Sequence, residues 1–273
     1  MRRLLFFVLL LGLSTLWVEA ERPAVRLLQD RGEGVGVLTR HGTDFAFFMP
    51  ETAGYWIPGI SVGEQSVWLH EAKNVRVRKQ NLGWLVEVED PILGKGVLTM
   101  EVLPLSASNG LIARVIGKKT PEGLHVVWAF GGCSASNEAS ERYNWFQPEQ
   151  CKDNVFSREI NAFTVYYGES MRLRVMMGVM PLDTDLQLSD ARSMQSPLAF
   201  RHSGKKTPAP ALSGVNLLTA DTPAYYCIYR QNRSADYNYY KLPEVFEQEK
   251  KSIKTDKNEE ADSHTSFGPD FHF

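Results

Sequence analysis

The sequence predicts an all-β protein, a large antiparallel β-sandwich with one short C-terminal helix. Short apolar segments recur about every 8–12 residues, with turn signals such as Ser108-Asn109-Gly110 between them, and this spacing is typical of sandwiches. In residues 84–89, Trp84, Val86 and Val88 fall on one face and Glu87 and Glu89 on the other, as expected of a strand with one buried face. Because strand and helix patterns do not alternate, a nucleotide-binding α/β fold is not expected.

The N-terminus predicts an exported protein. Arg2 and Arg3 precede an apolar run over residues 4–13, and small side chains precede a cleavage point after Ala20, so residues 1–20 are predicted to be a signal peptide. The apolar run is shorter than the roughly 20 residues that cross a bilayer. No later segment is long and apolar enough to do so. We therefore expect a periplasmic or secreted protein with no membrane span after cleavage.

The remaining chain divides into three predicted parts. Residues 21–240 carry the strand patterns and form the sandwich domain. Residues 241–254 form a short helix, because Pro243 suits its first turn and lysines gather near its end. Residues 255–273 are polar and without periodicity, which predicts a disordered tail.

Charge and motif content argue against several classes of protein. The chain has 273 residues with 30 Lys and Arg against 32 Asp and Glu, so it lacks the basic excess of a nucleic-acid binder. The glycines at 32–36 are not followed by the Lys-Ser/Thr of a phosphate-binding loop. Close Cys-x-x-Cys and His-x-x-x-His spacings are also missing. We predict neither a metal ion nor another cofactor.

A long polar loop follows the apolar strand at residues 124–130. Cys133 and Cys151 lie near its two ends, and the third cysteine, Cys227, lies in an apolar run and is predicted to be a core thiol. Cys133 and Cys151 can form a disulfide that closes the loop, or both can remain reduced. Spacing alone does not distinguish these two states.

Aromatic and amide side chains in two predicted loops form a candidate ligand site. A flat aromatic ring can cover the apolar face of a sugar while amides bind its hydroxyl groups. The alternative is that the rings pack beneath their loops as small satellite cores. The candidate ligand-binding residues are Tyr55, Trp56, Tyr143, Asn144, Trp145 and Gln147.

No catalytic residue is predicted. Glycoside hydrolysis needs two carboxylates that face each other across a cleft, and no spacing in the chain pairs any two of its acids. Each acid lies in a segment that is typical of a solvated loop or a turn. His125 lies on an apolar strand, where a hydrogen-bonded core histidine is the common outcome. The acids considered are Glu138, Glu141, Glu149, Asp153, Asp183, Asp185 and Asp190.

Four segments carry a resemblance to a known family. They are WAFGGCSASN (128–137), WFQPEQCKDNVF (145–156), FTVYYG (163–168) and RLRVMMGVMP (172–181). Together they resemble an uncharacterised domain family that forms the N-terminal β-sandwich of large exported bacterial proteins similar to glycoside hydrolases. The resemblance implies a role in polysaccharide breakdown, with catalysis in a following helical-barrel domain. No such continuation follows the helix here, so the catalytic residues of that barrel have no counterparts.

These observations lead to one main hypothesis and two alternatives. The main hypothesis is an exported, non-catalytic sandwich, naturally short or truncated, that contacts a polysaccharide, an oligosaccharide or a helical-barrel catalytic domain. The first alternative is a glycoside hydrolase or polysaccharide lyase with an acid pair in the loop at 131–154, such as Glu141 and Asp153. The second alternative is a structural remnant without a ligand.

Overall fold

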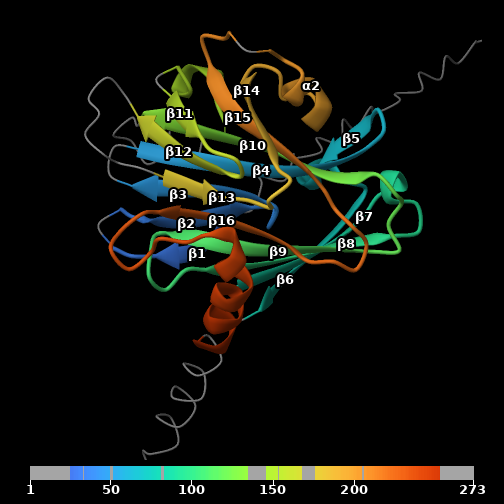
Figure 1. Ribbon diagram of the computed structural model, residues 1–273, viewed down its shortest axis with the longest axis horizontal. Coiled ribbons are helices and arrows are strands. Elements are labelled where there is room, and N and C mark those ends of the chain that lie inside the picture. Colours follow the sequence, from blue (N-terminus) through green and yellow to red (C-terminus); the bar gives the residue numbers. More distant parts are fainter. Residues whose placement is uncertain are drawn as a thin grey trace, which may run out of the picture.

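The computed structural model shows two packed antiparallel sheets (Figure 1). It describes residues 25–32, 34–49, 52–80, 83–134, 146–152, 154–167, 176–204 and 206–252. The predicted β-sandwich is therefore confirmed. The signal peptide and the tail at 255–273 lie outside the described residues and stay predictions, and no described helix is long and apolar enough to cross a membrane.

The described strands form two eight-stranded sheets in which every neighbouring pair is antiparallel. In spatial order, the first sheet contains β1 (Val25–Asp30), β2 (Gly36–Arg40), β3 (Asp44–Met49), β4 (Thr52–Val62), β10 (Leu124–Ser134), β15 (Pro210–Leu217) and β14 (Asp185–Asp190), and β5 (Gln65–Trp68) pairs with β4. The second contains β11 (Asn154–Arg158), β12 (Ala162–Tyr167), β13 (Met176–Val179), β16 (Ala224–Arg230), β9 (Gly110–Lys118), β8 (Val97–Pro104), β7 (Gly83–Glu89) and β6 (Asn74–Gln80).

A central core fills the space between the sheets. The predicted alternation is confirmed in β7, where Trp84, Val86 and Val88 all lie in this core. Aromatic rings from both sheets meet there: Trp56 of β4 lies 5.8 Å from Tyr226 of β16 between ring centroids. Because side chains alternate along each strand, one face of every central strand contributes to this core.

Two glycines make room for large rings in the core. Trp128 of β10 pairs in register with Gly214 of β15, and a Cβ atom added to Gly214 would lie 2.1 Å from the Trp128 ring. In the second sheet Phe163 pairs with Gly178, where an added Cβ would lie 2.1 Å from the Phe163 ring. The two rings meet across the core at 5.7 Å. Any side chain at either glycine would displace a ring.

Each sheet also has a covered outer face, and the two covers lie on opposite sides of the sandwich (Figure 1). On the first sheet the short helix α2 (Pro197–Arg201) and the turn η3 (Pro148–Gln150) lie over a first outer cluster. This cluster includes Tyr55, Trp68, Phe146 and Phe200. The remaining short turns are η1 (Leu69–Glu71), η2 (Pro91–Leu93) and η4 (Tyr239–Lys241).

The C-terminal helix covers the second sheet. Helical residues run from 242 to 252, and residue 241 belongs to the preceding turn η4. Phe246 is fully buried in a second outer cluster, with its ring against Tyr225 at 5.8 Å and beneath the Arg114 guanidinium at 4.6 Å. The buried Glu249 carboxylate accepts hydrogen bonds from the Ser106 backbone N and side-chain Oγ, both at 2.9 Å. The helix is therefore an integral part of the fold.

Candidate functional site

The candidate site is a cleft of about 470 Å³ on the outer face of the first sheet. Three strand ends meet there, where β15 ends and β10 and β14 begin, and α2 closes one side. The lining is Ser61, Gly63, Glu64, His125, Asp183, Asp185, Leu198, Arg201, His202, Val215, Asn216 and Leu217.

Strand alternation explains why polar side chains gather on this face. In β14, Leu186 packs into the central core, so Asp185, Gln187 and Ser189 lie on the opposite face. In β15, Leu212 packs into the core, so its neighbour Ser213 lies on that same outer face. The result is a polar stripe beside the first outer cluster.

The helix α2 brings a buried arginine to this stripe. The helix begins after Ser196, whose side chain accepts a hydrogen bond from Ala199 N at 3.1 Å, and Pro197 occupies its first turn. Arg201 ends the helix, and its side chain is only 8% exposed. No periodic pattern in residues 182–213 predicted this helix, because a single turn held by one cap has no apolar repeat.

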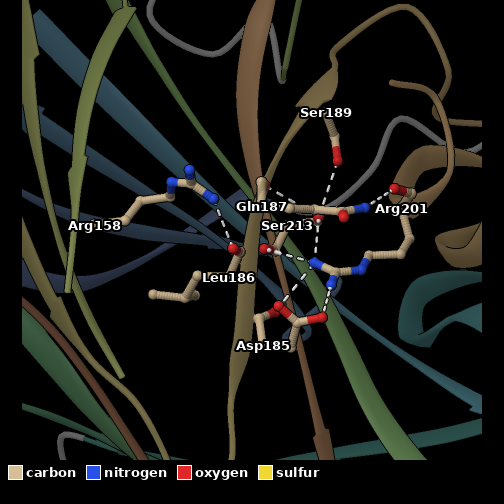
Figure 2. Close-up of polar contacts among 7 residues, drawn as sticks. All are labelled: Arg158, Asp185, Leu186, Gln187, Ser189, Arg201 and Ser213. Carbon is tan, nitrogen blue, oxygen red and sulfur yellow. Dashed lines mark hydrogen bonds and ion pairs between the residues drawn. The ribbon is translucent and has the colours of Figure 1, made fainter. Parts of the chain in front are cut away.

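The Arg201 guanidinium joins β14 to β15 (Figure 2). Nη1 donates to Asp185 O at 3.1 Å, to Ser213 O at 3.3 Å and to Ser213 Oγ at 3.1 Å, while Nη2 donates to Asp185 Oδ2. Gln187 Nε2 donates to Arg201 O, and Ser189 Oγ donates to Ser213 Oγ at 2.8 Å. Burial lowers the pKa of Arg201 from its usual value, and the Asp185 carboxylate opposes this shift. Arginine stays charged in proteins, so the network holds a fixed cation at the cleft wall.

In each of two further cleft residues, one side-chain atom is hydrogen-bonded to the backbone. His125 Nδ1 lies 2.9 Å from Gly123 O, and because a carbonyl only accepts, we assign the proton to Nδ1 and leave Nε2 as an acceptor. Asp183 Oδ2 accepts a hydrogen bond from Leu217 N at 3.0 Å. Glu64 and His202 are exposed. The cleft thus offers carboxylate and imidazole groups beside the apolar side chains of Leu198, Val215 and Leu217, whereas the Asn216 amide is buried and bonded to Tyr226 and Leu217.

The electrostatic character of the cleft is acidic. It contains three carboxylates, at Glu64, Asp183 and Asp185, against the single guanidinium of Arg201, which is already paired with Asp185. The carboxylates of the lining therefore outnumber its guanidinium by two. Such a site binds neutral or cationic groups more readily than anions.

The structure corrects the predicted aromatic site at Tyr55 and Trp56. Both residues lie on β4, with Tyr55 1% exposed in the first outer cluster and Trp56 fully buried in the central core. Neither ring is available to a ligand in solution. The alternative of satellite packing describes Tyr55 well, whereas Trp56 belongs to the main core.

Other predicted residues fall at or beyond the edge of the described chain. Gln147 is half-buried directly before η3. Tyr143, Asn144 and Trp145 lie outside the described residues, as do the acids of the alternative catalytic pair, Glu141 and Asp153. Their roles stay predictions.

The cysteines are placed only in part. Cys151 is buried in the first outer cluster, and a Cβ atom added to Gly131 would lie 3.1 Å from its sulfur. The backbone of Cys133 lies at the end of β10, but its side chain is outside the described part of the chain. A disulfide between them stays a prediction, tested by peptide mapping without reductant. Cys227 is fully buried, and burial raises the pKa of its thiol, which confirms the predicted core thiol.

Sequence reasoning missed most of the cleft. His125 and the pair Asp183 and Asp185 were considered, but as a core histidine and turn acids. The only local signals were a histidine inside an apolar strand and the Asp-Thr-Asp run at 183–185. Glu64, Arg201 and His202 have no distinguishing sequence context. Among the described residues no group of histidine, cysteine and acidic side chains is arranged to hold a metal ion.

The fold and cleft define a two-sheet β-sandwich with a polar, acidic cleft on one outer face. Its family can be stated directly: the chain belongs to the family described as "Domain of unknown function (DUF4450)", whose model matches residues 49–250. This confirms the resemblance to an uncharacterised domain family. No curated protein is similar to the chain in sequence.

Two distant likenesses are to solved structures of the same enzyme. An alpha-N-acetylgalactosaminidase, NagBb from Bifidobacterium bifidum in complex with GalNAc, is 9% identical with a TM-score of 0.33, over 74% of this chain and 36% of that chain. A quadruple mutant of the same enzyme is 9% identical with a TM-score of 0.27, over 70% and 35%. The chain therefore spans about a third of that enzyme's length. Likeness at this level carries no argument about function.

Proposed function

We propose that this chain is an exported, non-catalytic β-sandwich module of a carbohydrate-processing protein, and that the cleft beside Arg201 binds a neutral or amino-sugar oligosaccharide. The observation that carries the proposal is the lining of the cleft. Carboxylate and imidazole groups are common partners of sugar hydroxyls, and a few apolar side chains beside them suit the C–H faces of a sugar ring. The sequence resemblance supplies the carbohydrate context.

The excess of carboxylates in the cleft restricts which sugars we expect it to bind. An uronate or a sulfated sugar would place its charge beside Glu64 and Asp183 without a free guanidinium to receive it. A neutral oligosaccharide does not incur this repulsion, and the ammonium group of an amino sugar is attracted by it. Neutral and basic glycans are therefore the proposed ligands.

Both aspartates of the cleft already make contacts within the fold, and this favours ligand binding over catalysis. Asp183 accepts from the backbone of β15, and Asp185 is paired with Arg201. A general acid and a general base need freedom to exchange protons with a substrate. A helical-barrel catalytic partner remains part of the proposal through the resemblance.

Replacement of the two exposed polar residues of the cleft is expected to weaken glycan binding. In the double variant Glu64→Gln, His202→Ala, loss of two hydrogen-bonding groups worth about 0.5–1.5 kcal/mol each should weaken the affinity by roughly tenfold. The measurement is titration calorimetry with neutral, amino-sugar and uronate oligosaccharides. Both residues are exposed, so the fold should be unchanged.

The matched control is Glu244→Gln, which makes the same charge change on the helix that covers the other sheet. Wild-type affinity in the double variant, or tighter binding of uronates than of neutral sugars, would count against the cleft as the site. New reducing ends produced by the wild type and lost in Glu141→Gln would establish the enzymatic alternative instead.

A further inference from the structure

A second cavity lies apart from the cleft and shares no lining residue with it. Its volume is about 360 Å³, and its lining is Arg26, His41, His70, Ala72, Val75 and Val77. A smaller cavity of about 180 Å³ is also lined by His70, together with Arg40, Asp44, Ile57, Trp68, Phe146 and Met194. His70 is thus the side chain common to both cavities.

A buried carboxylate fixes the orientation of His70. Asp44 is 4% exposed, and its Oδ2 and Oδ1 atoms lie 2.9 and 3.1 Å from His70 Nδ1. Thr43 Oγ1 donates to Asp44 Oδ1 at 3.2 Å. With Nδ1 engaged, Nε2 is the nitrogen left for other partners, and it lies 3.9 Å from Glu71 Oε1, a distance too long for a hydrogen bond.

The larger cavity combines nitrogen donors with an apolar wall. The Arg26 guanidinium lies over the Trp84 ring at 5.4 Å, and within the described residues it has no carboxylate partner. His41 lies in the turn between β2 and β3 with a left-handed φ of 55°, and it is exposed. Ala72, Val75 and Val77 complete the wall. A guanidinium and two imidazoles beside aliphatic side chains suit a ligand with one anionic and one apolar end.

We propose that this cavity binds a small organic carboxylate, whose charged end contacts Arg26, His41 and protonated His70 and whose apolar part lies on Val75 and Val77. The site goes beyond the proposed glycan cleft and does not depend on it.

The charges around His70 make this binding dependent on pH. Arg26, Arg40 and protonated His70 give three positive charges, against the two negative charges of Asp44 and Glu71. Loss of the His70 proton removes the positive surplus, whereas protonation of His41 adds to it. A carboxylate therefore binds best when His70 is charged.

The pKa of His70 lies above its ordinary value. Burial alone would lower it, but the hydrogen bond to Asp44 and the charges of Asp44 and Glu71 outweigh burial and the repulsion of Arg40, so the pKa is raised above 6.5. Burial and Arg40 lower the pKa of His41, with His70 adding to the shift and Asp44 opposing it. Because His70 holds its proton more tightly in the folded chain than in the unfolded chain, protonation of His70 stabilises the fold. This stabilisation is fully present below the unfolded-state pKa and is lost as the pH rises through the folded-state pKa.

The test uses butyrate as the probe and butyramide as its neutral isostere, with the full chain. Proton spectra of the histidine rings and titration calorimetry between pH 5.5 and about 8.5 report binding and protonation together. We expect butyrate to shift the His70 and His41 ring signals, with an affinity that falls by up to about tenfold per pH unit above the pKa of His70, because Arg26 remains charged. Butyramide should bind at least about tenfold more weakly at the acid end of this range.

Three variants isolate the site. Arg26→Met should weaken butyrate binding by at least about tenfold, whereas Arg233→Met, an exposed arginine in the turn after β16, should leave it unchanged. His41→Asn tests the second imidazole, because asparagine tolerates a left-handed backbone. Both altered residues of the site are exposed, so the test does not depend on a core substitution.

Equal binding of butyrate and butyramide would overturn the proposal, and so would full affinity in Arg26→Met. Binding of inorganic phosphate without any binding of butyrate would also overturn it, because the ligand class would then be different. Loss of glycan binding at the cleft has no bearing on these outcomes, since the Glu64→Gln, His202→Ala variant leaves the second cavity intact.

Discussion

Replacement of Arg201 by methionine is expected to lower the free energy of unfolding by about 2–4 kcal/mol. The substitution leaves Asp185 O, Ser213 O and Ser213 Oγ without the donor that they share. A buried acceptor left without any donor costs about 1–3 kcal/mol, and Ser213 Oγ escapes this cost because Ser189 Oγ still donates to it. The Asp185 carboxylate is 77% exposed, so the ion pair itself adds little to the loss.

Urea denaturation and thermal melting measure this effect. For a domain of this size, the melting temperature should fall by about 5–15 °C. Arg201→Lys should recover only part of the loss, because an ammonium group cannot reproduce the two-pronged contact of the guanidinium with β14 and β15. Arg192→Met serves as the control: Arg192 also pairs with an aspartate, Asp190, but its side chain is 56% exposed. A loss as large in Arg192→Met as in Arg201→Met would contradict the role assigned to the buried network.

Local patterns predicted the fold because the sandwich depends on short-range alternation. In β7, Trp84 and Val86 lie two residues apart, and this period alone places both in the central core. Asn109-Gly110 marks the return from β8 to β9, since this pair adapts readily to tight turns. Neither inference needs any knowledge of distant residues.

The failure at Tyr55 and Trp56 has a specific physical cause. The glycines and prolines of residues 50–59 indicated a loop, yet β4 is an 11-residue central strand. Pro58 lies where pairing of β4 with β3 has ended at Trp56 and pairing with β5 has not begun, so one edge of the strand has no partner there. Gly59 is required because an added Cβ would lie 2.6 Å from Pro197 of α2. Both the missing partner at Pro58 and the contact at Gly59 depend on segments that are distant in sequence, so local patterns cannot predict them.

The cleft could not be predicted for a related reason. His125, Asp183 and Arg201 come from three distant segments, and their proximity follows from the order β10-β15-β14 in the first sheet. Single-sequence patterns give the faces of strands but not the order of strands in a sheet. Arg201 adds a further difficulty, because a lone arginine is typical of a surface and only the network of acceptors beneath α2 explains its burial.

Insertion of one methyl group at Gly214 is expected to be among the most damaging changes to the sandwich. In Gly214→Ala the new Cβ would lie 2.1 Å from the Trp128 ring, which is fully buried and packed against Phe163. The ring cannot shift without disturbing the contact between the two sheets. Overpacking of this kind costs about 1–3 kcal/mol and occasionally more, and we expect about 3 kcal/mol here because two sheets are affected.

A second substitution should restore part of this loss. Trp128→Phe removes the atoms that the new methyl group would strike, together with an indole N–H that is buried without a partner among the described residues. The double variant Trp128→Phe, Gly214→Ala should therefore be more stable than Gly214→Ala alone, with a coupling energy of at least about 1 kcal/mol in a double-mutant cycle. Urea denaturation of the wild type, the two single variants and the double variant gives the four free energies of unfolding that the cycle needs.

Gly83→Ala provides the matched comparison, because its new Cβ would strike Leu103 of β8, at 2.5 Å, and not an aromatic ring. Combined with Trp128→Phe, it should give additive losses, since a Cβ added at Gly83 would meet neither Trp128 nor Phe163. Equal coupling at both glycines would mean that Trp128→Phe loosens the whole core. Coupling at Gly214 alone would show that the glycine is present because the indole of Trp128 lies directly over it, and that this contact fixes how β10 and β15 meet the second sheet.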